Sequence, residues 1–260
     1  MTFSIAIAGK GGSGKTTTCS LMIGELRKRG LTPILAVDAD GNANLHESLG
    51  LKLGTTIGSI LAEFNSDKIS IPSGMNKGAF LQVRLNQAIV ESRGVDLISM
   101  GRGEGTGCYC YPNSVLKEFI DRLKGNYKYM VMDNEAGMEH LSRRTTENID
   151  ELLIASDYSV KGIRTAARIR ELVNELKLDV KRVSFILTRV PIKLLDERIT
   201  GELAELHIEP IALIPLDAEI QRFDMEQRSL LDLPDTSPAV HAVKKLMDEV
   251  LKPNPVGGAR

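Results

Sequence analysis

The residues with the clearest chemistry lie near the start of the chain. The pattern G-x-x-x-x-G-K-[ST] is matched, between an apolar segment and a helical one, by Gly9-Lys10-Gly11-Gly12-Ser13-Gly14-Lys15-Thr16. Glycines let successive backbone N–H groups face phosphate oxygens, and a helix that begins here adds the positive end of its dipole. We expect Lys15 to neutralise charge on the β- and γ-phosphates, the Thr16 hydroxyl to bind Mg²⁺, and Thr17 to lie beside the nucleotide. A glycine-rich turn that matches by chance is the alternative, but such a match seldom has this context.

Two carboxylates, Asp38 and Asp40, follow the apolar segment Ile34 to Val37. Acids at the carboxyl end of a parallel strand lie where ligands bind in open α/β sheets. One acid can hold a magnesium-bound water, and the other can orient or deprotonate the water that attacks the γ-phosphate. A solvated turn is the alternative, because Asp and Asn are common turn residues.

A further acid, Asp133, ends the apolar segment Tyr129 to Met132, and Gly137 follows closely. This arrangement predicts a second acid on the magnesium side and a glycine whose N–H senses the γ-phosphate. Loss of the γ-phosphate would then release Gly137 and its neighbours, which is a common way to convert hydrolysis into movement.

The cysteines Cys108 and Cys110 lie in a glycine-rich, polar segment. Residues i and i+2 of an extended segment point the same way, so both thiols are able to face one metal ion. A closed site needs four ligands, and a two-fold dimer would supply two from each chain. The alternatives are a pair of small buried hydrophobic residues or a redox pair. The third cysteine, Cys19, is expected to be core packing.

A second lysine, Lys10, makes the loop more specific. The run from Lys10 to Thr17 resembles the deviant Walker A motif of the family that includes the nitrogenase iron protein, MinD, partition ATPases and metal-insertion ATPases. The resemblance implies that Lys10 reaches across a nucleotide-sandwich homodimer to the partner's phosphates. It also implies that Asp40 acts on the attacking water while Asp38 supports the magnesium site, so catalysis falls to Lys10, Lys15 and Asp40. A solvated surface lysine is the alternative for Lys10.

A narrower resemblance involves the Cys-x-Cys pair, the run 133–141, and Thr236-Ser237-Pro238-Ala239. Together they are similar to the CooC-type ATPases, over essentially the whole chain. This implies a nucleotide- and metal-dependent homodimer that holds Ni²⁺, or Zn²⁺, at Cys108 and Cys110 of both subunits. The implied client is an apo carbon monoxide dehydrogenase or acetyl-CoA synthase. Such relatives often carry Asp-Pro where this chain has Asp40-Gly41, a change expected to loosen the loop.

The contacts to the base are less clear in the sequence. Thr188 and Arg189 stand where many relatives have Asn-Lys, and the guanine-reading acid is absent, which favours ATP. Pro215 and Asp217 resemble the loop that lines the base in these ATPases. We therefore expect these four residues to lie near the adenine.

Two other functions fit parts of the pattern. An iron–sulfur electron-transfer ATPase would use the cysteine pair for a cluster, but the nitrogenase iron protein spaces its cluster cysteines far apart. A metal-independent switch of the MinD or partition type would need a membrane-binding helix or a basic DNA surface. The Pro- and Gly-rich end of the chain and its near-zero net charge favour neither.

Elements that position these residues are visible as alternating apolar segments and longer amphipathic stretches, a pattern typical of βαβ units. The expected strands are Ser4 to Ala8, Ile34 to Val37, Val95 to Ser99, Tyr129 to Met132, Leu152 to Ala155, Val183 to Leu187 and Ile211 to Ile214. The expected helices include Thr16 to Arg29, Gly162 to Leu176, Leu194 to Leu206 and Ala239 to Leu251. The stretch from about Asn65 to Leu85 fits either a surface insertion or an irregular helical patch.

The whole pattern predicts a single α/β domain of the P-loop type, with a mostly parallel sheet of about seven strands and helices on both faces. We assign residues 1–251 to this domain and 252–260 to a flexible tail, because the tail is rich in Pro and Gly.

Bulk composition narrows the location and the partners. The chain has 260 residues, of which 42% are hydrophobic and 26% charged, with 33 Lys and Arg against 34 Asp and Glu. The net charge of -1 gives no field to hold a nucleic acid. No apolar run approaches the roughly 20 residues of a membrane span, and the first residues lack the basic region of a signal peptide. We expect a cytoplasmic protein with neither a nucleic acid nor a membrane as partner.

Overall fold

A parallel sheet forms the centre of the molecule. The computed structural model describes residues 2–65, 71–102, 118–134, 148–191 and 196–253. In these ranges a 7-stranded sheet has the order β3-β2-β4-β1-β5-β6-β7, and every neighbouring pair is parallel. The strands are β1 (Phe3–Gly9), β2 (Ile34–Ala39), β3 (Val95–Ser99), β4 (Tyr129–Asn134), β5 (Glu151–Asp157), β6 (Val183–Val190) and β7 (Pro210–Pro215). The predicted fold class and all seven predicted strands are confirmed; β3 has the predicted ends, and the ends of the other strands differ by at most three residues.

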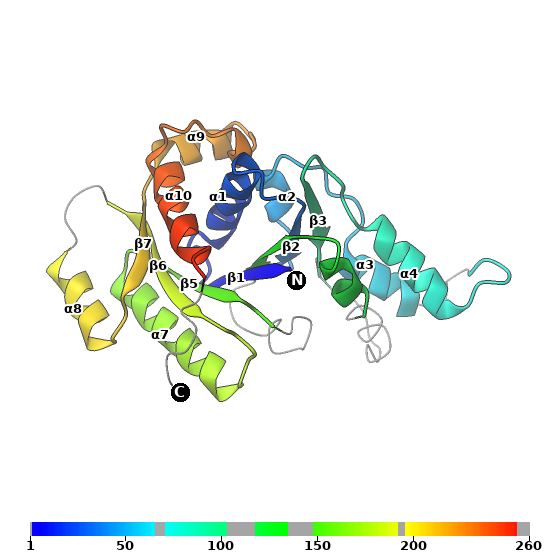
Figure 1. Cartoon of the computed structure of the whole chain (residues 1–260), viewed down its shortest axis with the longest axis horizontal. Helices are drawn as coiled ribbons and strands as arrows, with labels where there is room; N and C mark the ends of the chain where they lie inside the picture. Colours follow the sequence, from blue (N-terminus) through cyan, green and yellow to red (C-terminus); the bar gives the residue numbers. More distant parts are fainter. Residues whose placement is uncertain (1, 66–70, 103–117, 135–147, 192–195, 254–260) are drawn as a thin grey trace.

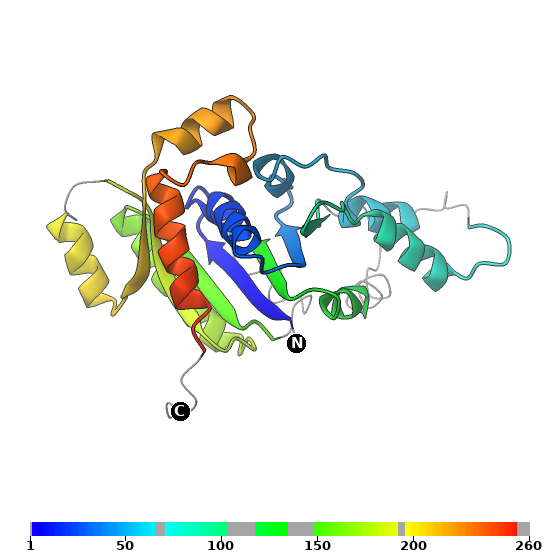
Figure 2. The same ribbon diagram turned by 45° about the horizontal axis from the view of Figure 1, so that its top comes forward.

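Helices cover both faces of the sheet. They are α1 (Lys15–Lys28), α2 (Leu45–Ser48), α3 (Ile57–Asn65), α4 (Lys77–Gln87), α7 (Val160–Glu175), α8 (Glu197–Glu205), α9 (Ala218–Met225) and α10 (Pro238–Val250), with a 3₁₀ turn η1 (Leu230–Asp232) and helical residues 118–124. Figures 1 and 2 show α1 and α10 side by side over one face, while α3 and α4 lie together beyond β3.

Two hydrophobic cores result, one on each face. Alternate residues along each strand point to opposite faces, so Ile5 and Ile7 of β1 pack with α1 and α10, while Ala6 and Ala8 pack on the side of α3, α4 and α7. Strands such as β1 and β2, which are buried on both faces, read as continuous apolar runs, which is why they were evident in the sequence.

The stretch that the sequence left unassigned contains a regular helix. Helix α4 begins after Asn76, whose side chain accepts a hydrogen bond from the Ala79 N–H at 2.8 Å, an N-cap. Its residues Leu81 and Leu85 are fully buried. The insertion is therefore a helix docked on the core rather than an irregular patch.

Other helix ends are also set by caps. Ser159 accepts from Gly162 at the start of α7, and Ser237 accepts from Val240 at the start of α10, where Pro238 occupies the first turn. The predicted helix from Leu194 corresponds to α8, which begins after the N-cap Asp196, while residues 192–195 lie outside the described ranges. Most of the predicted tail also lies outside them, so that assignment stays a prediction. Among the described helices, none combines the length and apolarity that crossing a membrane requires.

Candidate nucleotide-binding site

The phosphate loop leaves the sheet from its central region. Strand β1 lies between β4 and β5, and its last residue, Gly9, has φ 157°. A Cβ at Gly9 would lie 2.4 Å from the Ala155 carbonyl oxygen of β5, so only glycine fits. The loop closes where the Ser13 N–H donates to the Lys10 carbonyl at 3.1 Å. After Gly14, with φ 75°, helix α1 begins at Lys15, so the strand–loop–helix context is as predicted.

The two loop lysines occupy different environments. Lys15 is 7% exposed, and its Nζ donates to the Lys10 carbonyl at 3.3 Å, so its ammonium group lies folded over the loop. Lys10 is partly exposed. A buried lysine is positioned to meet phosphates in its own loop, whereas Lys10 has more freedom to reach outward.

An acid and a hydroxyl meet beside the loop. The Thr16 hydroxyl donates to Asp133 Oδ2 at 2.5 Å. Asp133 is 1% exposed, and among the residues that the structure describes its Oδ1 has no hydrogen-bond partner. The pKa of Asp133 is raised to about 7, chiefly by burial and also by the nearby Asp38 and Asp40 charges, while the hydrogen bond from Thr16 and the charge of Lys15 oppose the rise. A buried oxygen without a partner next to a hydroxyl suits a small cation, so Thr16 and Asp133 fit Mg²⁺.

Asp38 lies in the same row across the sheet, in register with Asp133. It is fully buried, its Oδ1 accepts from the Asp40 N–H at 3.1 Å, and its Oδ2 accepts from the Leu45 N–H at 2.9 Å. Burial raises its pKa to about 6 despite these bonds. Asp38 therefore fixes the loop between β2 and α2, and its support of the magnesium site stays a prediction.

Asp40 is partly exposed in a turn at the carboxyl end of β2. Its Oδ1 accepts from the Asn42 N–H at 2.8 Å, and its carbonyl accepts from the Ala43 N–H at 3.0 Å. These two bonds close the turn, although Gly41 was expected to loosen it. The described residues hold no group of three or more His, Cys, Asp or Glu side chains able to bind a metal ion. Mg²⁺ does not need one, because it keeps waters and shares substrate phosphates.

Thr188 contacts the phosphate loop itself. It is 3% exposed, and its hydroxyl donates to the Ser13 carbonyl at 2.8 Å, with the Ser156 carbonyl at 3.3 Å. A Cβ at Gly14 would lie 3.4 Å from Thr188 Oγ1. The carboxyl end of β6 thus supports the loop from behind, a role that the sequence did not indicate. A contact to the base stays a prediction for Thr188 and for the exposed Arg189.

Asp217 connects two helices. Its Oδ1 accepts from the Glu219 N–H at 2.9 Å at the start of α9. Its Oδ2 accepts from the Ser237 hydroxyl at 2.6 Å and from the Ala239 N–H at 3.2 Å at the start of α10. This structural role was not predicted, and base contacts of Pro215, which ends β7, and of Asp217 stay predictions.

Three of the predicted site residues are not described by the structure, and two residues near the loop were not predicted. Gly137, Cys108 and Cys110 lie outside the described residues. Ser99 was missed: it ends β3 in register with Asp38, is 1% exposed, and its hydroxyl has no partner within the described ranges. Arg102 was missed too, and its Nη2 donates to Asn42 Oδ1 at 3.0 Å. The one available signal for Ser99 was its position at the end of a predicted strand.

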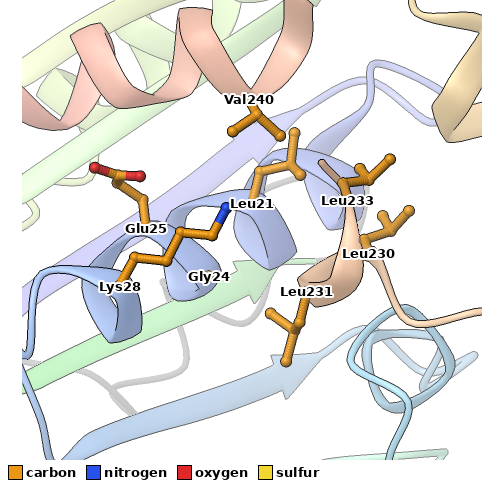
Figure 3. Close-up of a pocket in the computed structure, with 8 residues that line it drawn as sticks. All are labelled: Leu21, Gly24, Glu25, Lys28, Leu230, Leu231, Leu233 and Val240. Atoms are coloured by element: carbon orange, nitrogen blue, oxygen red, sulfur yellow. The ribbon is translucent and has the colours of Figure 1, made fainter. Parts of the chain in front are cut away.

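Two hollows lie away from the phosphate loop. One, of about 10 Å³, is shown in Figure 3 between α1, η1 and α10; it is lined by Leu21, Gly24, Glu25, Lys28, Leu230, Leu231, Leu233 and Val240. It has room for a water molecule only. The second, of about 290 Å³, is lined by charged groups that pair with one another, including Lys28 with Asp235 at 2.5 Å and Arg29 with Glu25 at 2.6 Å. Neither is lined by phosphate-loop residues.

A parallel sheet with a phosphate loop on a central strand, and a hydroxyl–carboxylate pair beside that loop, defines a P-loop nucleotide hydrolase. Residues 4–230 match the CobQ/CobB/MinD/ParA nucleotide binding domain, and the chain belongs to this family. It is a P-loop ATPase.

Similar proteins span the whole chain. An uncharacterized ATP-binding protein of Methanocaldococcus jannaschii is 38% identical over 249 residues, which cover 95% of this chain and 98% of that protein. The carbon monoxide dehydrogenase accessory protein CooC of Rhodospirillum rubrum is 27% identical over 261 residues, covering 96% and 97%. The structure of MinD with Mg-ADP from Pyrococcus horikoshii has a TM-score of 0.71 at 22% identity and covers 97% of both chains. This last similarity shows the fold.

Proposed function

We propose that the chain is an ATP-dependent maturation factor that binds nickel and delivers it to a carbon monoxide dehydrogenase or acetyl-CoA synthase type enzyme. The observation that carries the proposal is the Cys108-Tyr109-Cys110 sequence in a chain that resembles the CooC accessory protein along nearly its full length. In this proposal a homodimer holds one ion through Cys108 and Cys110 of both subunits. Thiolates also take Zn²⁺, so the metal is a matter for measurement.

The nucleotide site supplies the motor in this proposal. Backbone N–H groups of the loop and Lys15 would hold the phosphates, and Thr16 and Asp133 would hold Mg²⁺, which would neutralise phosphate charge. Asp40 orients the attacking water at the open end of β2, and Asp38 fixes the loop that carries it. Lys10 stabilises the partner's phosphates, so hydrolysis requires the dimer. Loss of the γ-phosphate then frees the segment around Gly137.

The metal assignment is tested by measuring bound metal per dimer after chelation and anaerobic reloading with Ni²⁺ or Zn²⁺. We expect one ion per two chains in the parent and none in the Cys108→Ala, Cys110→Ala double variant. Cys19→Ala is the matched control, because Cys19 is buried in α1 and burial raises its thiol pKa, which disfavours the thiolate. Equal nickel affinity in the double variant and the parent would refute the site.

A metal-independent switch ATPase is the second candidate. It is favoured by the MinD protein of Synechocystis, which is 25% identical over 221 residues, or 83% of this chain. This candidate predicts ATP-dependent dimers that are unaffected by chelators, whereas the maturation factor predicts dimers stabilised by metal. A visible absorption spectrum of anaerobically prepared protein tests for an iron–sulfur cluster. Co-purification of a nickel enzyme with the chain tests the client.

A further inference from the structure

The backbone just before Arg102 is hydrogen-bonded to β2 on one side and to α3 on the other. One residue past β3, the Met100 N–H donates to the Asp38 carbonyl and the Met100 carbonyl accepts from the Gly58 N–H, both at 2.7 Å. Gly101 has φ 62°, and a Cβ there would lie 2.6 Å from Thr56 Cβ. The chain is therefore pinned against β2 and the start of α3 (Figure 1).

From this fixed point the Arg102 side chain crosses the turn that carries Asp40. Its Cγ lies 3.3 Å from the position that a Cβ of Gly41 would take. Its Nη2 donates to Asn42 Oδ1 at 3.0 Å, and the Asn42 N–H donates to Asp40 Oδ1 at 2.8 Å. The aliphatic part of the Arg102 side chain thus lies against Gly41, and its guanidinium holds Asn42, whose backbone N–H orients the Asp40 carboxylate.

We propose that Arg102 is a positioning residue for ATP hydrolysis, which keeps the turn 40–42 in the geometry that Asp40 needs to act on the attacking water. The inference rests on the role of Asp40 in the proposed function, and it does not depend on nickel binding at Cys108 and Cys110. Arg102 is exposed, so its bond contributes little to folding. A small displacement of a water-orienting group nevertheless lowers turnover strongly.

The test compares Arg102→Ala, Asn42→Ala and the double variant, with Arg93→Ala as a control because Arg93 is an exposed arginine before the other end of β3. We expect each single variant to lower kcat about three- to tenfold while the Kd for ATP stays within about twofold. The double variant should turn over about as fast as either single variant, because the two side chains act through one contact. Melting temperatures should match the parent, and Arg93→Ala should behave as the parent.

Three results would overturn the inference. The first is an unchanged kcat in Arg102→Ala, and the second is a double variant in which the two losses multiply. The third is a weakened Kd for ATP in Arg102→Ala alone, which would make Arg102 a nucleotide contact. Asp40→Asn separates this failure from failure of the underlying role: if Asp40→Asn is inactive while Arg102→Ala is normal, only the inference is wrong. If Asp40→Asn retains full turnover, the role of Asp40 falls as well.

Discussion

Asp133 combines two roles that oppose each other. One carboxylate oxygen accepts a hydrogen bond from Thr16, and the other is buried with no partner in the described ranges of the chain. A buried carboxylate without full compensation costs folding free energy, but the same arrangement provides a ligand for the magnesium that accompanies ATP. The nucleotide-free protein therefore carries an unfavourable group at this site, as functional sites often do.

Replacing Asp133 by Asn should reveal this cost through its pH dependence. The folded-state pKa of about 7 lies above the ordinary value of 3.8, so the folded protein binds the proton more tightly than the unfolded chain. The contribution of Asp133 to stability is therefore most favourable below about pH 4 and falls as the pH rises towards about 7. Without nucleotide and Mg²⁺, Asp133→Asn should melt about 2–4 °C above the parent at pH 8, the shift for about 1 kcal/mol. The difference should shrink at pH 5.5, and ATP hydrolysis should be lost.

Melting curves in chelator at several pH values measure this effect. Asp121→Asn is the control: Asp121 is exposed, so this substitution should not change how the melting temperature depends on pH. A parent that is more stable than Asp133→Asn at pH 8 would contradict the account.

At the scale of elements, the phosphate loop depends on β6. Thr188→Val keeps the side-chain volume but removes the donor to the Ser13 carbonyl, in a buried position. An unpaired buried carbonyl costs about 1–3 kcal/mol. We expect the loop to relax away from its phosphate-binding geometry, so that the Kd for ATP rises about three- to tenfold. A tenfold change in Kd corresponds to about 1.4 kcal/mol, so this rise accounts for part of the cost of the unpaired carbonyl.

Calorimetric titration with ATP measures the change. Thr165→Val is a matched control, since the Thr165 hydroxyl donates within its own helix to the Lys161 carbonyl at 2.8 Å. Unchanged ATP affinity in Thr188→Val would show that the loop holds its shape without β6.

The strands and the phosphate loop could be predicted from the sequence, whereas the short helices and the long-range contacts could not. The strands and the phosphate loop follow from local patterns, since buried parallel strands are apolar runs and the loop is contiguous. Helices α2 and α9 were not predicted, because they span 4 and 8 residues and have too few turns for a clear period. Helix α3, of 9 residues, was not predicted either. The contacts of Thr188 with Ser13 and of Arg102 with Asn42 join residues 175 and 60 positions apart, so no local pattern encodes them. The contacts of Asp217 with the starts of α9 and α10 were not predicted either, while its contact with the base stays a prediction.

At the scale of the whole molecule, Lys10 decides whether one chain or two make the active unit. The loop uses the backbone carbonyl of Lys10, which accepts from Ser13 N–H and Lys15 Nζ. Lys10→Ala keeps this carbonyl and should bind ATP within a few-fold of the parent, but it should lose the ATP-dependent dimer and most turnover. Lys15→Ala should lose hydrolysis outright and bind ATP poorly.

Light scattering with and without ATP measures the dimer, and ATP titration of the monomer measures binding. Lys161→Ala, which removes an exposed lysine from α7, is the control for the loss of one positive charge. An ATP-dependent dimer that is unchanged in Lys10→Ala would refute the action of Lys10 across two chains.

Because β1 lies between β4 and β5, the nucleotide site forms only when strands that are distant in the sequence have paired with β1. The loop motif is complete at Thr16, yet its acid is Asp133, its neighbouring strand carries Ala155, and its support is Thr188. Contacts this distant in sequence form late, because long loops must close first. In a chain emerging from the ribosome, the loop motif is therefore present long before the residues that complete the binding site. We expect nascent chains to bind ATP only after β6 has left the exit tunnel.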